Sequence, residues 1–322
     1  MSLWINGMMG VVIGDVLGMP VQFVTREELK ESPVTTMEGY GTYDMPPGTW
    51  SDDSSMALAT LDSMRQNKGI NCDDIMLRFI KWTVNGEYTP AGVAFDQGTT
   101  CMEAIKNYVI NQDYRTCGKT GERANGNGAL MRIMPVCLYS YVRHRKGEIS
   151  IGEAVEAVHQ VSALTHNHLR SKMACGIYFF MIQSILDNEG SLIDRLQMGM
   201  DNAGQFYKSD VMNILEWSRF GRMNNLVEFK SVPEEHIKST GYVLDSIEAA
   251  VWSLINADSF EDGLLKAVNL GDDTDTIGAI AGGLAGLYYG YENIPKEWRN
   301  VIIKRDEIIA LCELTEEEFN VR

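Results

Sequence analysis

The amino-acid sequence predicts an all-α fold built as one domain of residues 1–322. Apolar residues recur three or four positions apart through most of the chain, which is the spacing of one helix face. Alternation with a period of two between turn residues, which would indicate strands, is almost absent. The two densest groups of acidic residues lie near opposite ends of the chain with no linker between them, so we expect one domain.

The first and the last long apolar helices share a pattern of small residues. The first is expected to end near Pro20, because proline cannot continue a helix. A glycine inside a helix costs on the order of 1 kcal/mol relative to alanine, so close packing against another backbone must offset it. We therefore expect the two helices to be neighbours, packed through the glycines at 7, 10, 14 and 18 in one and at 278, 282, 286 and 290 in the other.

The stretch between these helices is also predicted to be mainly helical. Helical periodicity covers residues 75–84, 102–110, 130–142, 151–164, 173–186, 192–206, 211–220, 243–255 and 260–268, and two short helices are expected after Pro295. Residues 31–50 are instead rich in proline, glycine, threonine and tyrosine, which predicts a long irregular loop. Because loops of this length are usually functional lids or disordered, we interpret this one as a mobile lid.

Hydroxyl and carboxylate side chains crowd the expected start of two helices. Ser51, Asp52 and Asp53 follow the long loop directly, and a second group of three acids and two threonines occupies residues 272–276. Either group alone is explained by helix capping. Two copies more than 200 residues apart predict instead that the two helix starts fold together into an oxygen cage for two hard cations, Mg²⁺, Mn²⁺ or Ca²⁺.

Three polar interruptions lie between the helices. Asp96, within FDQGTT, is a candidate general base or a helix cap. The loop GERANGNG at 121–128 offers free N–H groups to a phosphate, but it lacks the lysine of a P-loop. His166 stands two positions before His168, a spacing that does not suit zinc on one helix face, so we expect His166 to cap a helix or contact a ligand.

Composition excludes several classes of protein. A net charge of −16 leaves no basic face to displace counterions, so general binding to nucleic acid or anionic membrane is not expected. The six cysteines form no C-x-x-C pair and are interpreted as reduced thiols of a cytoplasmic protein. The N-terminus has no basic segment, and Asp15 interrupts its apolar stretch, so neither a signal peptide nor a membrane anchor is expected.

Six of these segments, taken in order and spacing, resemble the ADP-ribosylglycohydrolases, which include the dinitrogenase reductase activating glycohydrolases. They are GDVLGMPVQF (14–23), GTWSDDSSMAL (48–58), FDQGTT (95–100), GNGALMR (126–132), LTHNH (164–168) and GDDTDTIGAIAGGLAG (271–286). The resemblance implies a compact orthogonal multi-helix bundle with two Mg²⁺ or Mn²⁺ ions at the bottom of a cleft. It also implies hydrolysis of the glycosidic bond that joins ADP-ribose to an acceptor, either a protein or a small molecule.

The resemblance assigns roles to individual positions. It implies that the metal ligands are Ser51, Asp52, Asp53, Asp273, Asp275 and Thr276. The diphosphate would be held by Gly126, Asn127, Gly128, Ala129 and His166. Asp96 and Gly98 would face the ribose or its leaving group, and Asp53 or Asp96 would take the proton from the attacking water.

Three departures from the family pattern affect function. Gln22 stands where the family commonly has glutamate, Ser51 replaces threonine, and Asp272 replaces a glycine. Because glutamine cannot titrate, one interpretation is a weakened catalyst that Gln22→Glu would speed up; the other is that Gln22 is fitted to this protein's own substrate. A catalytically weak ADP-ribose binder and a binuclear nucleotide phosphohydrolase therefore stay open as alternatives, and the linkage that is cleaved cannot be read from the sequence.

Overall fold

The computed structural model describes residues 2–319 and confirms the all-α prediction, since this part of the chain contains α-helices and no β-strand. The first helices are α1 (Leu3–Gly18), α2 (Arg26–Glu31), α3 (Asp52–Asn67), α4 (Cys72–Asn85), α5 (Thr99–Asn111), α6 (Tyr114–Cys117), α7 (Met134–Arg145), α8 (Ile151–Ser162) and α9 (Leu169–Asp187). They are followed by α10 (Leu192–Lys208), α11 (Val211–Trp217), α12 (Leu226–Lys230), α13 (Val243–Ile255), α14 (Phe260–Val268), α15 (Thr274–Tyr289), α16 (Lys296–Val301) and α17 (Arg305–Phe319).

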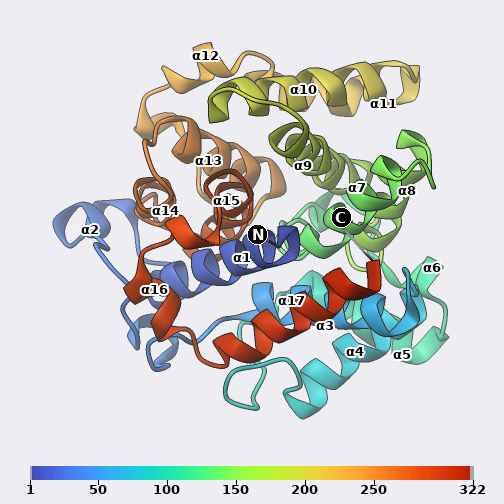
Figure 1. Cartoon of the computed structure of the whole chain (residues 1–322), viewed down its shortest axis with the longest axis horizontal. Helices are drawn as coiled ribbons and strands as arrows, with labels where there is room; N and C mark the ends of the chain where they lie inside the picture. The colour runs from blue at the N-terminus through green and yellow to red at the C-terminus, as the bar shows by residue number, and fades with distance from the viewer. Residues whose placement is uncertain (1, 320–322) are drawn as a thin grey trace.

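Helices α1 and α15 pack side by side through most of the predicted glycines (Figure 1). Two do not take part as predicted, because Gly7 mainly faces Met134 and Leu138 of α7 and an added Cβ at Gly290 would meet nothing within 4 Å among the described residues. A Cβ added to Gly14 would lie 1.9 Å from the carbonyl oxygen of Gly278, and one added to Gly10 would lie 2.1 Å from that of Gly282. Real side chains do not approach backbone so closely, and the two helices touch backbone to backbone. The hydroxyl of Thr274 also donates to the carbonyl of Gly18 at 2.7 Å, which ties the end of α1 to the start of α15.

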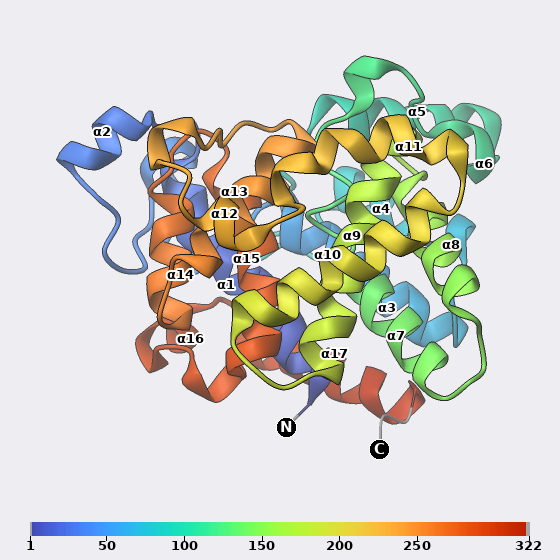
Figure 2. The same cartoon turned by 90° about the horizontal axis from the view of Figure 1, so that it is seen from above.

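The other helices surround this central pair. α9, α13 and α14 contact α15, while α3, α7 and α17 contact α1. The start of α1 and the end of α17 lie on the same side of the molecule, where the rings of Trp4 and Phe319 are 5.8 Å apart (Figure 2). The segment Leu3–Val21 is long and apolar enough to cross a membrane, but 83% of it is buried in the protein, as in the core helix of a folded domain.

Three sequence predictions about elements are wrong in their bounds. The helix predicted over 130–142 begins only at Met134, because Pro135 belongs in the first turn of a helix and residues 130–133 form turns before it. The last helix, α17, has 15 residues and is not short. The helix predicted over 211–220 is α-helical only to Trp217, and it continues as a 3₁₀ helix over Ser218–Met223. The loop predicted over 31–50 is irregular from residue 32 on, apart from a 3₁₀ turn at Gly41–Tyr43, but Glu31 is the last residue of α2.

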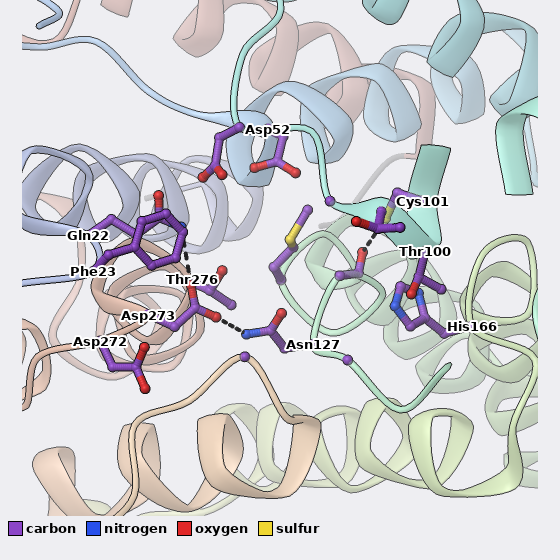
Figure 3. A pocket seen from close by; sticks show the side chains of 17 residues that line it. Gln22, Phe23, Asp52, Thr100, Cys101, Asn127, His166, Asp272, Asp273 and Thr276 are labelled. Atoms are coloured by element: carbon purple, nitrogen blue, oxygen red, sulfur yellow. Dashed lines mark hydrogen bonds between the residues drawn. The ribbon is translucent and has the colours of Figure 1, made fainter. Parts of the chain in front are cut away.

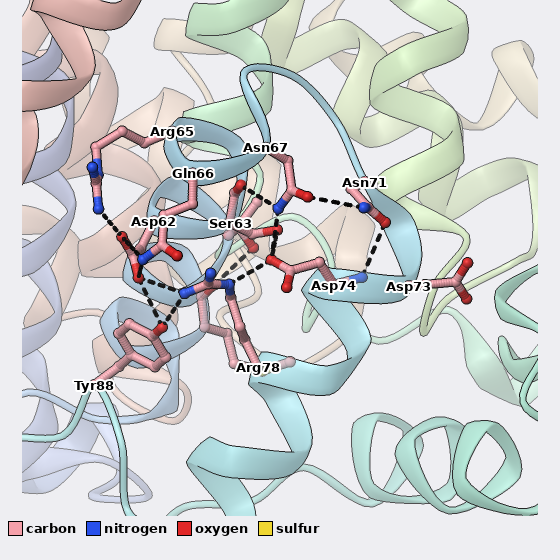
Figure 4. A network of polar contacts seen from close by, with 12 residues as sticks. Asp62, Ser63, Arg65, Gln66, Asn67, Asn71, Asp73, Asp74, Arg78 and Tyr88 are labelled. Atoms are coloured by element: carbon pink, nitrogen blue, oxygen red, sulfur yellow. Dashed lines mark hydrogen bonds and ion pairs between the residues drawn. The ribbon is translucent and has the colours of Figure 1, made fainter.

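A polar network joins the C-terminal part of α3 to α4 (Figure 4). Arg78 donates to Asp62, to Asp74 at 2.6 Å and to the hydroxyl of Tyr88 at 2.5 Å. Burial alone would raise the pKa of Asp62, but hydrogen bonds from Arg65 and the charge of Arg78 outweigh burial and lower it. Carboxylates in the middle of α3 therefore have cationic partners.

Candidate active site

A hollow of about 270 Å³ opens between the first turns of α3 and α15, and most of the predicted site residues line it (Figure 3). The predicted residues on its wall are Gln22, Asp52, Asp96, Gly98, Gly126, Asn127, Gly128, His166, Asp273 and Thr276. The remaining predicted residues, Ser51, Asp53, Ala129 and Asp275, are buried and do not line the hollow. The structure thus brings segments from both ends of the chain together, as expected from the two acidic groups.

The start of α3 is held in place by a buried carboxylate from α1. Ser51 is the N-cap residue, and its hydroxyl accepts from the backbone N–H of Asp53 and donates to the Asp53 carboxylate at 3.1 Å. Asp15 accepts from the backbone N–H of Ser51 at 3.0 Å, from that of Ser54 at 3.0 Å and from the Ser54 hydroxyl at 2.6 Å. Burial raises the pKa of Asp15 to about 6, partly offset by these hydrogen bonds.

The start of α15 presents carboxylates toward α3. Asp273 occupies the N-cap position without capping the helix, because its carboxylate instead accepts from the side-chain amides of Gln22, at 3.2 Å, and Asn127. Thr276 donates from its hydroxyl to Asp53 at 3.4 Å, which links the two acidic groups directly. Asp275 accepts from the backbone N–H of Thr276 at 2.8 Å and is fully buried.

Negative charge in this site lacks a counterion. Burial, and then neighbouring carboxylates, raise the pKa values of Asp52, Asp53 and Asp275 well above their usual range. One oxygen of Asp53, Oδ1, and one of Asp275, Oδ2, are buried without a hydrogen-bond partner in the described part of the chain. No lysine or arginine is among the described residues that line the hollow. These carboxylates therefore differ from Asp62, whose charge pairs with Arg78.

The donor set suits a hard cation, although it is not a ready-made cage. All the side chains at the two helix starts offer oxygen, from carboxylates and hydroxyls, and this is the ligand type that Mg²⁺ and Mn²⁺ prefer. Within residues 2–319, no three carboxylate, imidazole or thiol groups converge closely enough to enclose a metal ion. Side chains at the two helix starts would have to turn toward a bound ion, and the unpartnered oxygens of Asp53 and Asp275 are free to accept it.

The opposite wall is the polar loop that precedes α7. Asn127 donates its backbone N–H to Gly241 at 3.0 Å, and its side chain donates to Ser246 at 2.9 Å as well as to Asp273. A Cβ on Gly128 would lie 3.0 Å from Cε1 of His166, so a glycine is needed where this loop crosses the imidazole. Burial lowers the pKa of His166 to about 3, with Arg132 adding to the effect, so the ring is neutral at pH 7. Ala129 lies behind this wall, buried.

The long loop closes one side of the site through Gln22. Gln22 is only 4% exposed, and its side-chain oxygen accepts from the hydroxyl of Tyr43 at 2.6 Å. The hydroxyl of Thr42 donates to the Gln22 carbonyl at 2.6 Å. Burial, together with a hydrogen bond to Asp96 and its charge, raises the pKa of Tyr43, so its hydroxyl stays protonated and available to donate. Gln22 is thus held between the loop and Asp273.

Comparison with known proteins identifies the family. The ADP-ribosylglycohydrolase family profile matches residues 4–322. The chain belongs to the ADP-ribosylglycohydrolase family. An ADP-ribosylarginine hydrolase, Tri1, from Serratia proteamaculans is 29% identical over 96% of this chain and 77% of its own length. An ADP-ribosyl-[dinitrogen reductase] glycohydrolase from Rhodospirillum rubrum is 27% identical over 91% of this chain and 88% of its own length. A solved structure described as an ADP-ribosylglycohydrolase-related protein complex superimposes with a TM-score of 0.77, at 27% identity, over 99% of this chain and 98% of that chain.

Membership in the ADP-ribosylglycohydrolase family confirms the resemblance stated from the six motifs, and the chain is a hydrolase of ADP-ribose glycosidic bonds.

Sequence reasoning missed two residues of this ADP-ribosylglycohydrolase site. Asp15 was used only as the charged residue that interrupts an apolar stretch. A carboxylate inside an otherwise apolar helix is itself the signal that could have marked Asp15 as functional. Tyr43 lies in an irregular loop where no spacing rule selects one tyrosine from another.

Proposed function

We propose that the protein is a cytoplasmic, metal-dependent hydrolase that uses two Mg²⁺ or Mn²⁺ ions to release ADP-ribose from an ADP-ribosylated protein. The observation that carries the metal requirement is the pair of buried, unpartnered oxygens on Asp53 and Asp275 in a hollow without lysine or arginine. The relatives named for ADP-ribosylarginine and for dinitrogen reductase support a protein acceptor.

The residues that would hold the ions come from the two helix starts. Ser51, Asp52 and Asp53 would bind from α3, and Asp273, Asp275 and Thr276 from α15. Bound divalent cations supply a polarising charge and lower the pKa of water. Asp15 fixes the first turn of α3, and Gln22 and Asn127 fix the Asp273 carboxylate, so the ligands are oriented by neighbours that do not themselves bind metal.

Residues on the other walls of the hollow would bind the diphosphate, accept a proton and exclude water. The loop at 126–128 with His166 would bind the diphosphate through the backbone N–H groups of Gly126 and Gly128, since that of Asn127 donates to Gly241, while the neutral imidazole adds no charge. Asp96, half-exposed near Asp52 and Tyr43, would take the proton from the attacking water, with Asp53 as the alternative acceptor. Tyr43 donates to Gln22 from the loop and would exclude water from that side.

Incubation of the protein with an ADP-ribosylated protein tests this proposal. Free ADP-ribose should appear with Mg²⁺ or Mn²⁺ and not after EDTA treatment. Release of phosphate instead would indicate the binuclear phosphohydrolase, and tight binding of ADP-ribose without turnover would indicate the silent relative.

A variant pair tests the metal ligands. Asp275→Ala should lose bound metal and activity together. Asp62→Asn removes a carboxylate from the same helix, α3, but from the arginine-paired network outside the hollow, and should keep both metals. If Asp275→Ala retained two ions per chain by elemental analysis, the assignment of ligands would be wrong.

A further inference from the structure

A fully buried arginine lies behind the wall of the hollow. Arg132 follows Met131, which lines the hollow, but the Arg132 side chain itself is 0% exposed. Its Nη2 donates to the carbonyl of Val161 at 3.2 Å and to the hydroxyl of Thr165 at 2.8 Å, and neither of these partners is a carboxylate. Its Nε and Nη1 have no hydrogen-bond partner within the described residues. Because burying a charge without a carboxylate partner is costly, packing alone does not account for this arginine.

Arg132 is linked to His166 through a single hydroxyl. The Thr165 hydroxyl that accepts from Arg132 also lies 2.9 Å from Nδ1 of His166. The other ring nitrogen, Nε2, faces the polar loop, since a Cβ added to Gly126 would lie 3.4 Å from it. His166 lines the hollow at this point (Figure 3). One edge of the imidazole is therefore bonded toward the protein interior, and the other edge is turned toward the ligand.

The chemistry of the three groups gives this chain of hydrogen bonds a direction. A guanidinium has donors and no acceptor, so the Thr165 oxygen must accept from Arg132. The hydroxyl keeps one hydrogen to donate, and the two groups near it are Nδ1 of His166 and the thiol of Cys101. Sulfur is a weak acceptor, whereas the unprotonated nitrogen of an imidazole accepts well. The hydroxyl therefore donates to Nδ1, which leaves the ring proton on Nε2.

The charge of Arg132 favours the same arrangement. A lone pair on Nδ1 directs negative charge toward the guanidinium, whereas an N–H there would direct positive charge toward it. This preference is stronger inside the protein than in water, because the effective dielectric constant is lower. Burial, with Arg132 adding to the effect, lowers the pKa of His166 to about 3, so the ring carries one proton at neutral pH. That proton faces the hollow.

We propose that Arg132 and Thr165 are positioning residues that hold His166 as its Nε2–H tautomer, so that the imidazole donates a hydrogen bond to a phosphoryl oxygen of ADP-ribose. This inference rests on the proposed function, in which His166 lies against the diphosphate. It supplies the anionic diphosphate with a side-chain donor in a hollow whose described lining includes aspartates but no lysine or arginine. The second ring nitrogen of a functional histidine is commonly held in this way, by a partner that selects the tautomer.

NMR of the full-length natural protein, with isotope-labelled histidine and bound Mg²⁺ at neutral pH, measures the tautomer directly. The protonated and unprotonated ring nitrogens of a neutral histidine have well-separated chemical shifts, and the His166 signals are those that disappear in His166→Leu. We expect an unprotonated Nδ1 and a protonated Nε2. A ring protonated on Nδ1, wholly or in part, would overturn the proposal without recourse to any variant at Arg132 or Thr165.

Variants of the two positioning residues test their contribution. Thr165→Val keeps the shape of the side chain but removes the hydroxyl, so the ring-nitrogen signals of His166 should move toward each other as both tautomers become accessible. Its affinity for ADP-ribose, measured by calorimetry at matched Mg²⁺, should fall about 2- to 10-fold, the usual contribution of one intramolecular hydrogen bond. Thr165→Ser should restore both the signals and the affinity. Arg132→Met, which removes the cation, should shift the His166 signals in the same direction as Thr165→Val.

Two controls separate this role from general damage to the fold. Thr315→Val also removes a hydroxyl that is 0% exposed, one that donates to the carbonyl of Leu311 at 2.7 Å in α17, outside the hollow. It should leave the His166 signals and the ADP-ribose affinity unchanged. His159, whose Nε2 lies 2.8 Å from the hydroxyl of Tyr207, should keep its own signals in every variant.

A double variant shows whether Thr165 acts through the imidazole. His166→Leu alone should weaken ADP-ribose about 10- to 100-fold, the usual effect of losing a hydrogen bond to a charged group. Adding Thr165→Val to His166→Leu should then weaken it no further, because the two residues act as one unit. Equal weakening by Thr165→Val with and without the imidazole would refute the positioning role, as would natural signals and affinity in Thr165→Val.

The outcomes distinguish this inference from the proposed function. A natural protein that releases ADP-ribose but whose His166 is protonated on Nδ1 refutes the positioning role while the hydrolase stands. A natural protein that binds ADP-ribose with the expected tautomer and the expected effects of the variants, but releases none from an ADP-ribosylated protein, supports the positioning role while the proposed hydrolase fails. If ADP-ribose does not bind at all, both fail.

Discussion

Replacing Gln22 by glutamate should lower kcat. Gln22 donates to one oxygen of the Asp273 carboxylate at 3.2 Å while its own oxygen accepts from Tyr43 at 2.6 Å, so its amide has a defined orientation. A glutamate would keep the bond from Tyr43, but it would replace the donor with a second carboxylate oxygen. The hydrogen bond to Asp273 becomes a repulsion at a residue that we assign to the metal site.

The magnitude follows from the distance. Loss of a hydrogen bond to a charged group costs about 1.5–3 kcal/mol. Two full charges about 4 Å apart repel by roughly 4 kcal/mol at an effective dielectric constant of 20. If the activation free energy rises only by the energy of the lost hydrogen bond, kcat should fall about 10- to 100-fold.

The assay compares two variants with the natural protein at saturating Mg²⁺ and ADP-ribosylated substrate. Gln22→Met keeps the size of the side chain but removes both the donor to Asp273 and the acceptor for Tyr43, so it measures the loss of both hydrogen bonds without an added charge. Gln22→Glu should be slower than Gln22→Met, because it adds the repulsion. A Gln22→Glu protein faster than the natural one would refute this reasoning and support the weakened catalyst, for which a gain of about 10²- to 10⁴-fold is expected.

Three other perturbations have expected outcomes. Gly14→Ala should lower the free energy of unfolding by at least about 1–3 kcal/mol, because the added Cβ would lie 1.9 Å from a backbone oxygen. Gly152→Ala, whose added Cβ would lie 3.9 Å from its nearest neighbour, should be neutral or stabilising. Chemical denaturation measures both variants, and equal stabilities would contradict the packing of α1 against α15. Chymotrypsin, which cleaves after aromatic residues such as Tyr40, should cut residues 31–50 more slowly when ADP-ribose is bound, and Tyr43→Phe should weaken that protection; identical cutting with and without ligand would argue against a lid. In EDTA-treated protein, the contribution of Asp15 to the free energy of unfolding should decrease as pH rises from about 4 to about 6, because the pKa of this carboxyl is raised in the folded state. The melting temperature of the natural protein should therefore fall relative to that of Asp15→Asn over this pH range. A constant difference between the two melting temperatures would contradict the raised pKa.

Residues next to a helix start or on a regular helix face were predictable from the sequence. The acidic groups at Asp52 and Asp273 were recognised because carboxylates and hydroxyls crowd positions where an apolar helix begins, and the structure indeed brings those helix starts together. The contact between α1 and α15 followed from the glycine spacing, since only close packing explains repeated glycine in a helix.

Residues whose role depends on distant contacts were not predictable. Asp15 reaches Ser51 across 36 positions, and no local pattern indicates which turn of another helix a buried carboxylate will support. Tyr43 reaches Gln22 from a loop without periodicity. The left-handed conformation of Asp272 was also hidden, because aspartate tolerates it only occasionally and the sequence shows the side chain without the backbone.

The pairing of α1 with α15 constrains the order of folding during synthesis, because the two helices lie at opposite ends of the chain. The bond from Thr274 to Gly18 spans 256 residues, so α1 leaves the ribosome long before its partner is made. At a synthesis rate of about 5–20 residues per second, α1 waits roughly 10–50 s without the helix that covers its glycine face. During that interval the nascent chain carries an apolar segment long enough to resemble a membrane span. A chaperone that shields α1 on the ribosome would raise the yield of active enzyme more than one that acts on the released chain.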